Sequence, residues 1–417
     1  MQISPEEPQG VLEQNSASKA LLPLAFASFT RMLGVSIVDL ILVLYAVNLG
    51  ADAFLSGIAV GAFSIAQVLL QIPMGRLSDK IGRKKTIQLG VLIYAIGTGM
   101  CGFAQNIYQL IAFRFLAGSS AYIAVIQAFL GDLFGSKERG RAMSYYSAGV
   151  TLGYAVGLPL GGLLASLFLN LPFFVNFLLA MVSFTLIHFF VDEPSGERKG
   201  KLNNNGTKIN WRDLFRNRLF LVTIGTDCLA IFVFSSLLVF ITPFGRSFGY
   251  STYDFSLIMV LLVLIMITGF IIGGKYSYRL GRSNTILIGF LIAGPLLLAQ
   301  TFVTTPIGLV VIAAFLIFGI GLAWTNMPAL ILDSVSDPAC RATATSIYNT
   351  IRFISNAIGP VVMGYVIGLY SPDPSDLSAG IRVSYLISGT IYLVACFIVF
   401  FFLRKYERQN RTICESG

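Results

Sequence analysis

Twelve long apolar runs dominate this 417-residue sequence and constrain its fold more than any other feature. About 20 consecutive apolar residues let a helix cross the hydrocarbon core of a bilayer, which is about 30 Å thick. Only 12% of the residues are charged, whereas soluble domains average about 25%. The sequence therefore predicts an all-α membrane protein with helices at 22–47, 53–74, 86–104, 107–133, 142–168, 172–191, 219–242, 254–274, 284–303, 306–332, 342–370 and 382–403.

The basic residues predict how these helices are oriented. Of the 29 lysines and arginines, only Arg246 and Arg382 fall on one side of the predicted bundle, and three arginines fall inside it. The rest lie on the other side, and cytoplasmic loops carry such an excess in membrane proteins. Both termini are therefore expected in the cytoplasm, with the chain in the cell (cytoplasmic or inner) membrane. The net charge of +9 reflects this topology and gives no reason to expect a nucleic-acid partner.

The sequence gives no support for a cleaved signal peptide, a metal site or an enzyme active site. The first apolar run is long and follows an acidic N-terminus, so it is expected to be a retained span and not a cleaved signal peptide. The five cysteines show no paired spacing and the chain has one histidine, His188, so neither a metal nor another cofactor is expected. The H-E-x-x-H and G-x-S-x-G motifs are absent, and we expect no enzyme activity.

A polar segment at 192–218 divides the chain into two sets of six spans. Its middle is rich in Gly and Asn, which is typical of a flexible linker. Its end, INWRDLFRNR, opposes apolar residues to arginines and predicts a short interfacial helix. The expected domains are a cytoplasmic tail (1–21), a six-helix bundle (22–191), the linker (192–218), a second six-helix bundle (219–403) and a C-terminal cytoplasmic tail (404–417).

The two sets of spans repeat one another. GRLSDKIGRKKTIQLGVLI at 75–93 aligns with GKYSYRLGRSNTILIGFLI at 274–292 at a constant offset of 199 residues. Asp132, near the end of the fourth span, is matched by Asp333 near the end of the tenth. Many secondary transporters are built from such repeats, related by a pseudo-two-fold axis.

Three motifs make the chain similar to the major facilitator superfamily over essentially the whole bundle. GRLSDKIGRKK resembles that family's loop 2–3 signature, and LIAFRFLAG resembles the helix 4 motif of proton-coupled members. GYAVGLPLGG at 153–162 resembles the helix 5 antiporter motif, with its proline one place late. The resemblance implies the twelve-span drug–proton antiporter branch. The antiporter-motif residues are Gly149, Gly153, Gly157, Pro159, Gly161 and Gly162.

The resemblance also implies a conformational latch at the loop 2–3 signature. Asp79 would lie at the positive N-terminus of helix 11, near Arg341, and Arg83 would pair with Asp132. The second-half copy has Tyr278 in place of Asp79, so the latch should be strong on one side only. The complete predicted latch is Gly75, Asp79, Gly82, Arg83, Lys84, Asp132 and Arg341.

The glycines of helix 5 recur at every fourth residue and predict one closely packed face. Two interpretations share this physics: plain packing, or a sliding contact between the two halves. Gly269 and Gly273 of helix 8 are a possible counterpart for such a contact.

Five ionisable residues fall deep inside predicted spans, where a charge costs about 2.5–3.5 kcal/mol or more and usually finds a partner. Counting along the spans places Asp39 and Arg114 in an outer layer and Arg31, Asp227 and Arg352 in an inner layer. The outer pair is either a structural ion pair or also the proton-responsive element, and Asp227 is a further proton candidate. The inner layer is either a gate between the halves or a charge-selecting part of the cavity.

Aromatic and polar residues near these charges are candidates for the wall of a substrate cavity, although ordinary packing is favoured for any single aromatic residue. The complete set of cavity candidates is Arg31, Asp39, Tyr122, Tyr154, Phe232, Phe234, Trp324, Asn326, Tyr348 and Arg352.

These features predict a secondary transporter that works by alternating access. The leading expectation is proton-coupled efflux of small, partly apolar organic compounds, with the proton as coupling ion and the chain a monomer in the bilayer. The alternative is a sugar or metabolite exporter, or an exchanger of organic anions, which three buried arginines against two buried acids would favour. A sensor that transports nothing is a further hypothesis.

Overall fold

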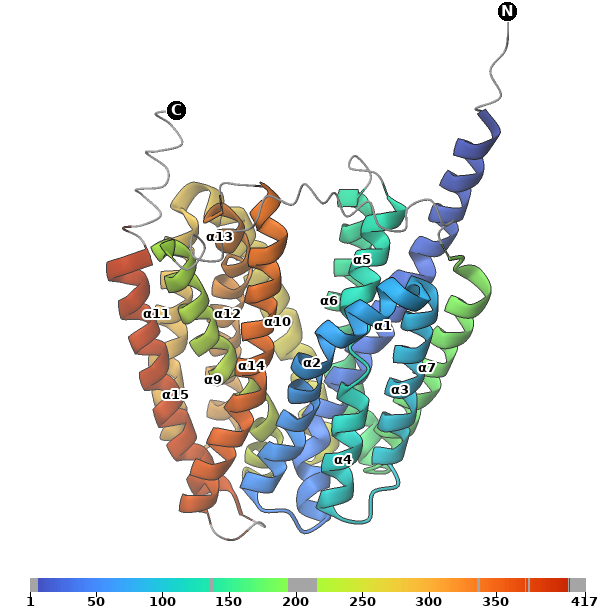
Figure 1. Ribbon diagram of the computed structural model, residues 1–417. Helices are drawn as coiled ribbons and strands as arrows, with labels where there is room; N and C mark the ends of the chain where they lie inside the picture. The colour runs from blue at the N-terminus through green and yellow to red at the C-terminus, as the bar shows by residue number, and fades with distance from the viewer. Residues whose placement is uncertain are drawn as a thin grey trace, which may run out of the picture. The chain divides into compact units, whose positions relative to one another are not determined.

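The computed structural model describes residues 7–134, 139–193, 216–335, 338–371, 373, 376–403 and 405, except for the side chains of 7–19, 139–141, 338–343 and 346. Every regular element in this part of the chain is a helix (Figure 1). Eleven of these helices, counting α4 with α5 and α12 with α13, are long and apolar enough to cross a membrane. The one predicted span that is not among these eleven, 86–104, corresponds to α3, which begins with three basic residues. The predicted all-α, multi-pass architecture is confirmed.

The first helices are α1 (Glu7–Asn48), α2 (Ala53–Ile81), α3 (Arg83–Cys101), α4 (Ile107–Gly118), α5 (Ile123–Leu133), α6 (Arg139–Leu167) and α7 (Leu171–Phe190). The later ones are α9 (Arg218–Ser247), α10 (Thr252–Leu280), α11 (Arg282–Thr301), α12 (Pro306–Trp324), α13 (Met327–Asp333), α14 (Pro338–Tyr370) and α15 (Ser378–Ile398), which continues as a π-helical turn over Val399–Leu403. Most of the predicted linker, including the proposed interfacial segment up to residue 215, and most of the predicted C-terminal tail lie outside the described residues. The predicted N-terminal tail, 1–21, differs from the structure, because its residues 7–21 belong to α1.

The helices form two compact units, whose boundary differs from that of the predicted six-helix halves. One unit contains residues 1–41 and 62–205, and the other contains 42–61 and 206–417. Within the second unit, α2 approaches the backbone of α14 closely: a Cβ added to Gly57 would lie 2.2 Å from the carbonyl oxygen of Pro360. Small residues at this contact explain why the start of α2 groups with the later helices.

Two predicted spans are interrupted. The run at 107–133 forms α4 and α5, separated by residues 119–122, where Ala121 has a φ of 31°. The run at 306–332 forms α12 and α13. At each break a side-chain amide donates a hydrogen bond to a backbone carbonyl oxygen. Gln67 Nε2 donates to Gly118 O (3.0 Å), and Asn326 Nδ2 donates to Leu322 O (2.9 Å).

The glycine face of α6 packs against α1 within the first unit. A Cβ added to Gly149, Gly153 or Gly161 would lie 2.7, 2.3 or 2.4 Å from a carbonyl oxygen of α1, and one at Gly157 would meet Leu33 O at 2.5 Å. The expected close packing is confirmed. Gly269 and Gly273 of helix 8 (α10) pack within the second unit, where a Cβ at either would meet the backbone of α12. A sliding contact between the two halves stays a prediction.

Candidate functional site

Arg83 is the centre of a polar cluster at the turn between α2 and α3. Its guanidinium lies 3.0 Å from Asp79 Oδ1 and 3.0 Å from Asp132 Oδ2, and it also donates to Ser78 Oγ at 3.0 Å. The predicted Arg83–Asp132 pair is therefore present. Asp79, whose side chain is 61% exposed, has Arg83 as an ion-pair partner. The side chain of Arg341 lies outside the described residues, so its proximity to Asp79 stays a prediction.

Glu193, which the sequence analysis did not single out, caps the start of α3. Its carboxylate accepts the backbone N–H groups of Arg83 and of Lys84, the latter at 2.9 Å. An anion is favourable at the positive N-terminus of a helix. Gly82 has a φ of 103°, a left-handed backbone conformation that favours glycine, and a Cβ there would also lie 2.6 Å from this carboxylate. Gly75 has no such role, since a Cβ there would meet nothing within 4 Å in its own unit.

The second copy of the signature forms a simpler cluster. Arg282 lies 2.7 Å from Asp333, which matches the first-half pair of Arg83 with Asp132. Tyr278 stands where Asp79 stands in the first copy, and it is 92% exposed. The repeat therefore preserves one ion pair and omits the second carboxylate.

We predict that Arg83→Gln loosens the turn between α2 and α3 more than Arg282→Gln loosens the turn between α10 and α11. The first substitution removes contacts to two carboxylates, those of Asp79 and Asp132, whereas the second copy has Tyr278 in place of the first of these. Both clusters are partly exposed, so each variant should lose only about 1 kcal/mol or less of folding free energy. Amide hydrogen exchange at the two turns provides the comparison, with thermal unfolding as the check on folding. Equal increases in exchange at the two turns would contradict the predicted asymmetry.

Asp39 of α1 and Arg114 of α4 form a buried ion pair. Arg114 Nη2 donates to Asp39 Oδ1 at 3.3 Å, and the side chains are 5% (Arg114) and 16% (Asp39) exposed. The ring of Phe63, from α2, lies 4.6 Å from the Arg114 guanidinium. The structure thus brings together the two residues of the predicted outer layer.

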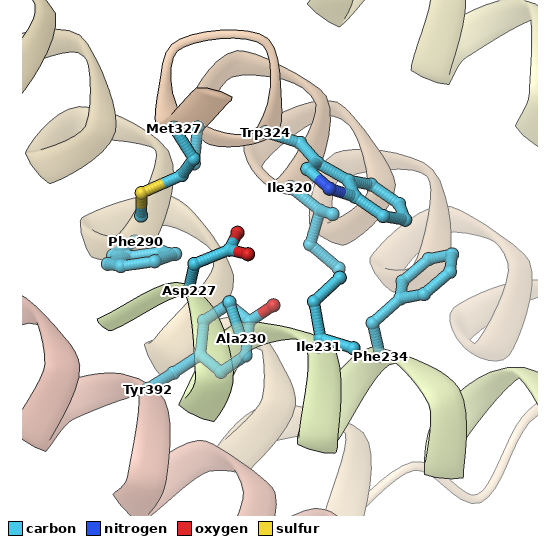
Figure 2. Close-up of a pocket in the computed structure, with 10 residues that line it drawn as sticks. Asp227, Ala230, Ile231, Phe234, Phe290, Ile320, Trp324, Met327 and Tyr392 are labelled. Atoms are coloured by element: carbon cyan, nitrogen blue, oxygen red, sulfur yellow. The ribbon is translucent and has the colours of Figure 1, made fainter. Parts of the chain in front are cut away.

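Asp227 of α9 and Arg352 of α14 form the second buried pair, with Arg352 Nε 3.4 Å from Asp227 Oδ2. The Asp227 side chain is 1% exposed, and neither of its oxygens has a hydrogen-bond partner among the described residues. The carboxylate faces a small cavity with aromatic walls (Figure 2). The lining residues are Asp227, Ala230, Ile231, Phe234, Phe290, Ile320, Ala323, Trp324, Met327 and Tyr392.

Two predicted cavity residues, Phe234 and Trp324, line this space with their rings 4.5 Å apart. Tyr348 is buried, and its ring lies 5.2 Å from the Arg352 guanidinium. Asn326 is also buried, but its amide nitrogen donates to carbonyl oxygens of α10 and α12, so it has a clear packing role at the helix break.

The remaining cavity candidates belong to other surroundings. Arg31 lies in the first unit among aromatic rings, including that of buried Tyr122. The predicted inner layer of Arg31, Asp227 and Arg352 spans both units and stays a prediction. Tyr154 and Phe232 are half-buried. No three His, Cys, Asp or Glu side chains gather as a metal site within the described ranges.

The sequence as a whole matches the model of the Major Facilitator Superfamily, over residues 24–360 and again over 285–413. The chain belongs to the major facilitator superfamily. Transporters of this superfamily handle small molecules within the membrane, and this chain is a multi-pass member with the superfamily's fold.

Similar proteins include several transporters. The inner membrane transport protein YajR of Escherichia coli is 28% identical, over 82% of this chain and 75% of its own length. Multidrug resistance protein 2 of Bacillus subtilis is 22% identical, over 87% of this chain and 91% of its own. A bacterial homologue of the human lysosomal transporter Spinster superposes with a TM-score of 0.81 at 19% identity, covering 94% of this chain and 98% of that one.

Proposed function

We propose that this transporter exports small organic compounds from the cell in exchange for protons, by alternating access. The observation that carries the proposal is the buried ion pair between Asp39 and Arg114, 3.3 Å apart. A charge at the centre of a bilayer costs about 2.5–3.5 kcal/mol or more, and residues retained there generally have a transport role.

The pair provides a means of coupling. Protonation neutralises Asp39 and removes its attraction for Arg114, so a proton and a close contact between these side chains are alternatives. If protonation favours one conformation of the transporter and bound substrate favours the other, binding of the proton promotes release of the substrate, and the reverse. Asp227, which has the same relation to Arg352 in the second unit, is a second candidate proton site.

Other observations support export across the cell membrane. Relatives of the chain include proteins named for multidrug resistance. The asymmetric distribution of lysine and arginine favours cytoplasmic termini. The polar cluster around Arg83 would then lie on the cytoplasmic side, where Asp79 and Arg83 would act as a latch on one conformation.

Exchange of organic anions is a second candidate, favoured by a specific observation. The described part of the chain buries Arg31 and Arg114 almost completely and Arg352 partly, but only two carboxylates accompany them, Asp39 and Asp227. An excess of buried positive charge suits an anionic substrate.

Reconstituted liposomes test the proposal. The full chain is supplied with a cation, a neutral compound and an anion in turn: ethidium, chloramphenicol and 1-naphthoate. We expect at least one to move against its gradient when a proton gradient is imposed, and to stop when an ionophore collapses that gradient. Movement that ignores the proton gradient would reject antiport, and no movement of any of the three would count against export of such compounds.

A further inference from the structure

Arg31 is a buried cation that forms no ion pair with the side chains that the structure describes. Arg31 is only 3% exposed, and its Nη1 atom has no hydrogen-bond partner in the described part of the chain. Asp39 lies eight residues further along α1, a rise of about 12 Å along the helix axis at 1.5 Å per residue. Its carboxylate is within electrostatic range of Arg31, but its ion pair is with Arg114. Asp227 is in the other unit and contacts Arg352.

Aromatic rings hold the Arg31 guanidinium in place without neutralising it. The guanidinium carbon lies 4.1 Å from the ring centre of Tyr94, 4.8 Å from that of Phe63 and 5.4 Å from that of Tyr122. Asn176 of α7 fixes Tyr94 by donating to its hydroxyl at 2.9 Å. Ring faces attract a cation and lower the cost of burying it, but its N–H groups still need an acceptor.

The internal repeat shows that the fold does not require this arrangement. At the offset of 199 residues, Arg31 corresponds to Ala230, Phe63 to Leu262 and Tyr94 to Ala293. The same offset relates the ends of α1 and α9 (Asn48, Ser247). The second copy therefore lacks the arginine and both rings together. In their place it has a cavity, to which Ala230 contributes (Figure 2).

We infer that Arg31 is an anion-binding residue and that compounds handled by this transporter include organic acids, a statement of substrate class that rests on the transport function proposed above. A guanidinium offers two parallel N–H donors that match a carboxylate. Bound in this way, the acid supplies the charge that Arg31 lacks. The rings of Phe63, Tyr94 and Tyr122 suit an aromatic or other apolar body on the same molecule.

Calorimetric titration of the detergent-solubilised full chain tests this with three probes that share one ring system: 1-naphthoate, 1-naphthamide and 1-naphthylmethylamine. We expect 1-naphthoate to bind at least about tenfold more tightly than the other two, because hydrogen bonds to charged groups contribute about 1.5–3 kcal/mol. Equal binding of the acid and the amide, or tighter binding of the amine, would overturn the inference.

Substitutions then place the site. Arg31→Gln should lose about tenfold or more in affinity for 1-naphthoate, and Arg31→Lys should retain part of it. Arg382→Gln is the matched control, because Arg382 also lies close to two rings and donates to a backbone carbonyl, but belongs to α15. Unchanged affinity in a folded Arg31→Gln, or an equal loss in Arg382→Gln, would refute the assignment. If Arg31→Gln fails to fold, Arg31→Lys takes its place. The assignment is then refuted if Arg31→Lys binds 1-naphthoate as tightly as the wild type does and shows no preference for 1-naphthoate over 1-naphthamide.

A third arm separates a transported acid from an anionic lipid. Adding phosphatidylglycerol should leave 1-naphthoate binding unchanged, whereas competition between the two would assign the site to a lipid headgroup and overturn the substrate class. These measurements use no proton gradient. Failure of proton coupling would therefore refute the proposed antiport and leave this inference standing, and failure of acid selectivity would do the reverse.

Discussion

Asp39→Asn should abolish transport against a gradient while leaving movement down a gradient in place. The substitution keeps the shape of the side chain and an oxygen that can accept a hydrogen bond from Arg114, 3.3 Å away in the wild type. It removes the group that takes up and releases a proton. We therefore expect proton-driven accumulation in liposomes to fall to the level of liposomes without protein, with exchange down a gradient retained.

Two controls make this result specific. Asp192→Asn changes an exposed carboxylate at the end of α7 and should transport like the wild type. Thermal unfolding of Asp39→Asn must show a folded protein, because breaking a buried ion pair can cost about 3–5 kcal/mol. Full uphill transport by a folded Asp39→Asn would contradict the role given to the pair.

Gly153→Leu should strongly destabilise the first unit. Its Cβ would lie 2.3 Å from the carbonyl oxygen of Phe29 and 2.9 Å from the backbone nitrogen of Leu33. Backbone atoms cannot rotate away, so α1 and α6 must separate. Overpacking costs about 1–3 kcal/mol and occasionally more, and we expect the upper end of this range or a failure to fold.

The matched control for this prediction is Gly225→Leu. A Cβ at Gly225, on α9, would meet nothing within 4 Å. Thermal unfolding in detergent should show a midpoint close to that of the wild type for Gly225→Leu and a clearly lower midpoint for Gly153→Leu. Equal midpoints for the two variants would mean that the close contact of α6 with α1 does not limit stability.

The sequence predicts the helices and several ion pairs because their signals are strong. Apolar length identifies the spans, and a charge within a span requires a partner, which leads to Asp39 with Arg114. The repeat and the family motif together predict Arg83 with Asp132. Both pairs are present in the structure.

Other features depend on contacts that have no periodic signal. The breaks after α4 and α12 lie within runs that are apolar on both sides, and only short polar segments, such as Ser119–Ser120 and Thr325–Asn326, mark them. Glu193 reaches α3 from the end of α7, which is far away in the sequence. The rings around Arg31 come from separate segments, so only packing brings them together.

Proton release on substrate addition tests the central claim most directly. The wild type, Asp39→Asn and Asp227→Asn are placed in weakly buffered detergent solution with a pH-indicator dye, and ethidium, chloramphenicol and 1-naphthoate are added in turn. Our account predicts that at least one compound releases protons from the wild type and from Asp227→Asn but not from Asp39→Asn. Release that persists in Asp39→Asn and disappears in Asp227→Asn would contradict it and move the proton site to α9.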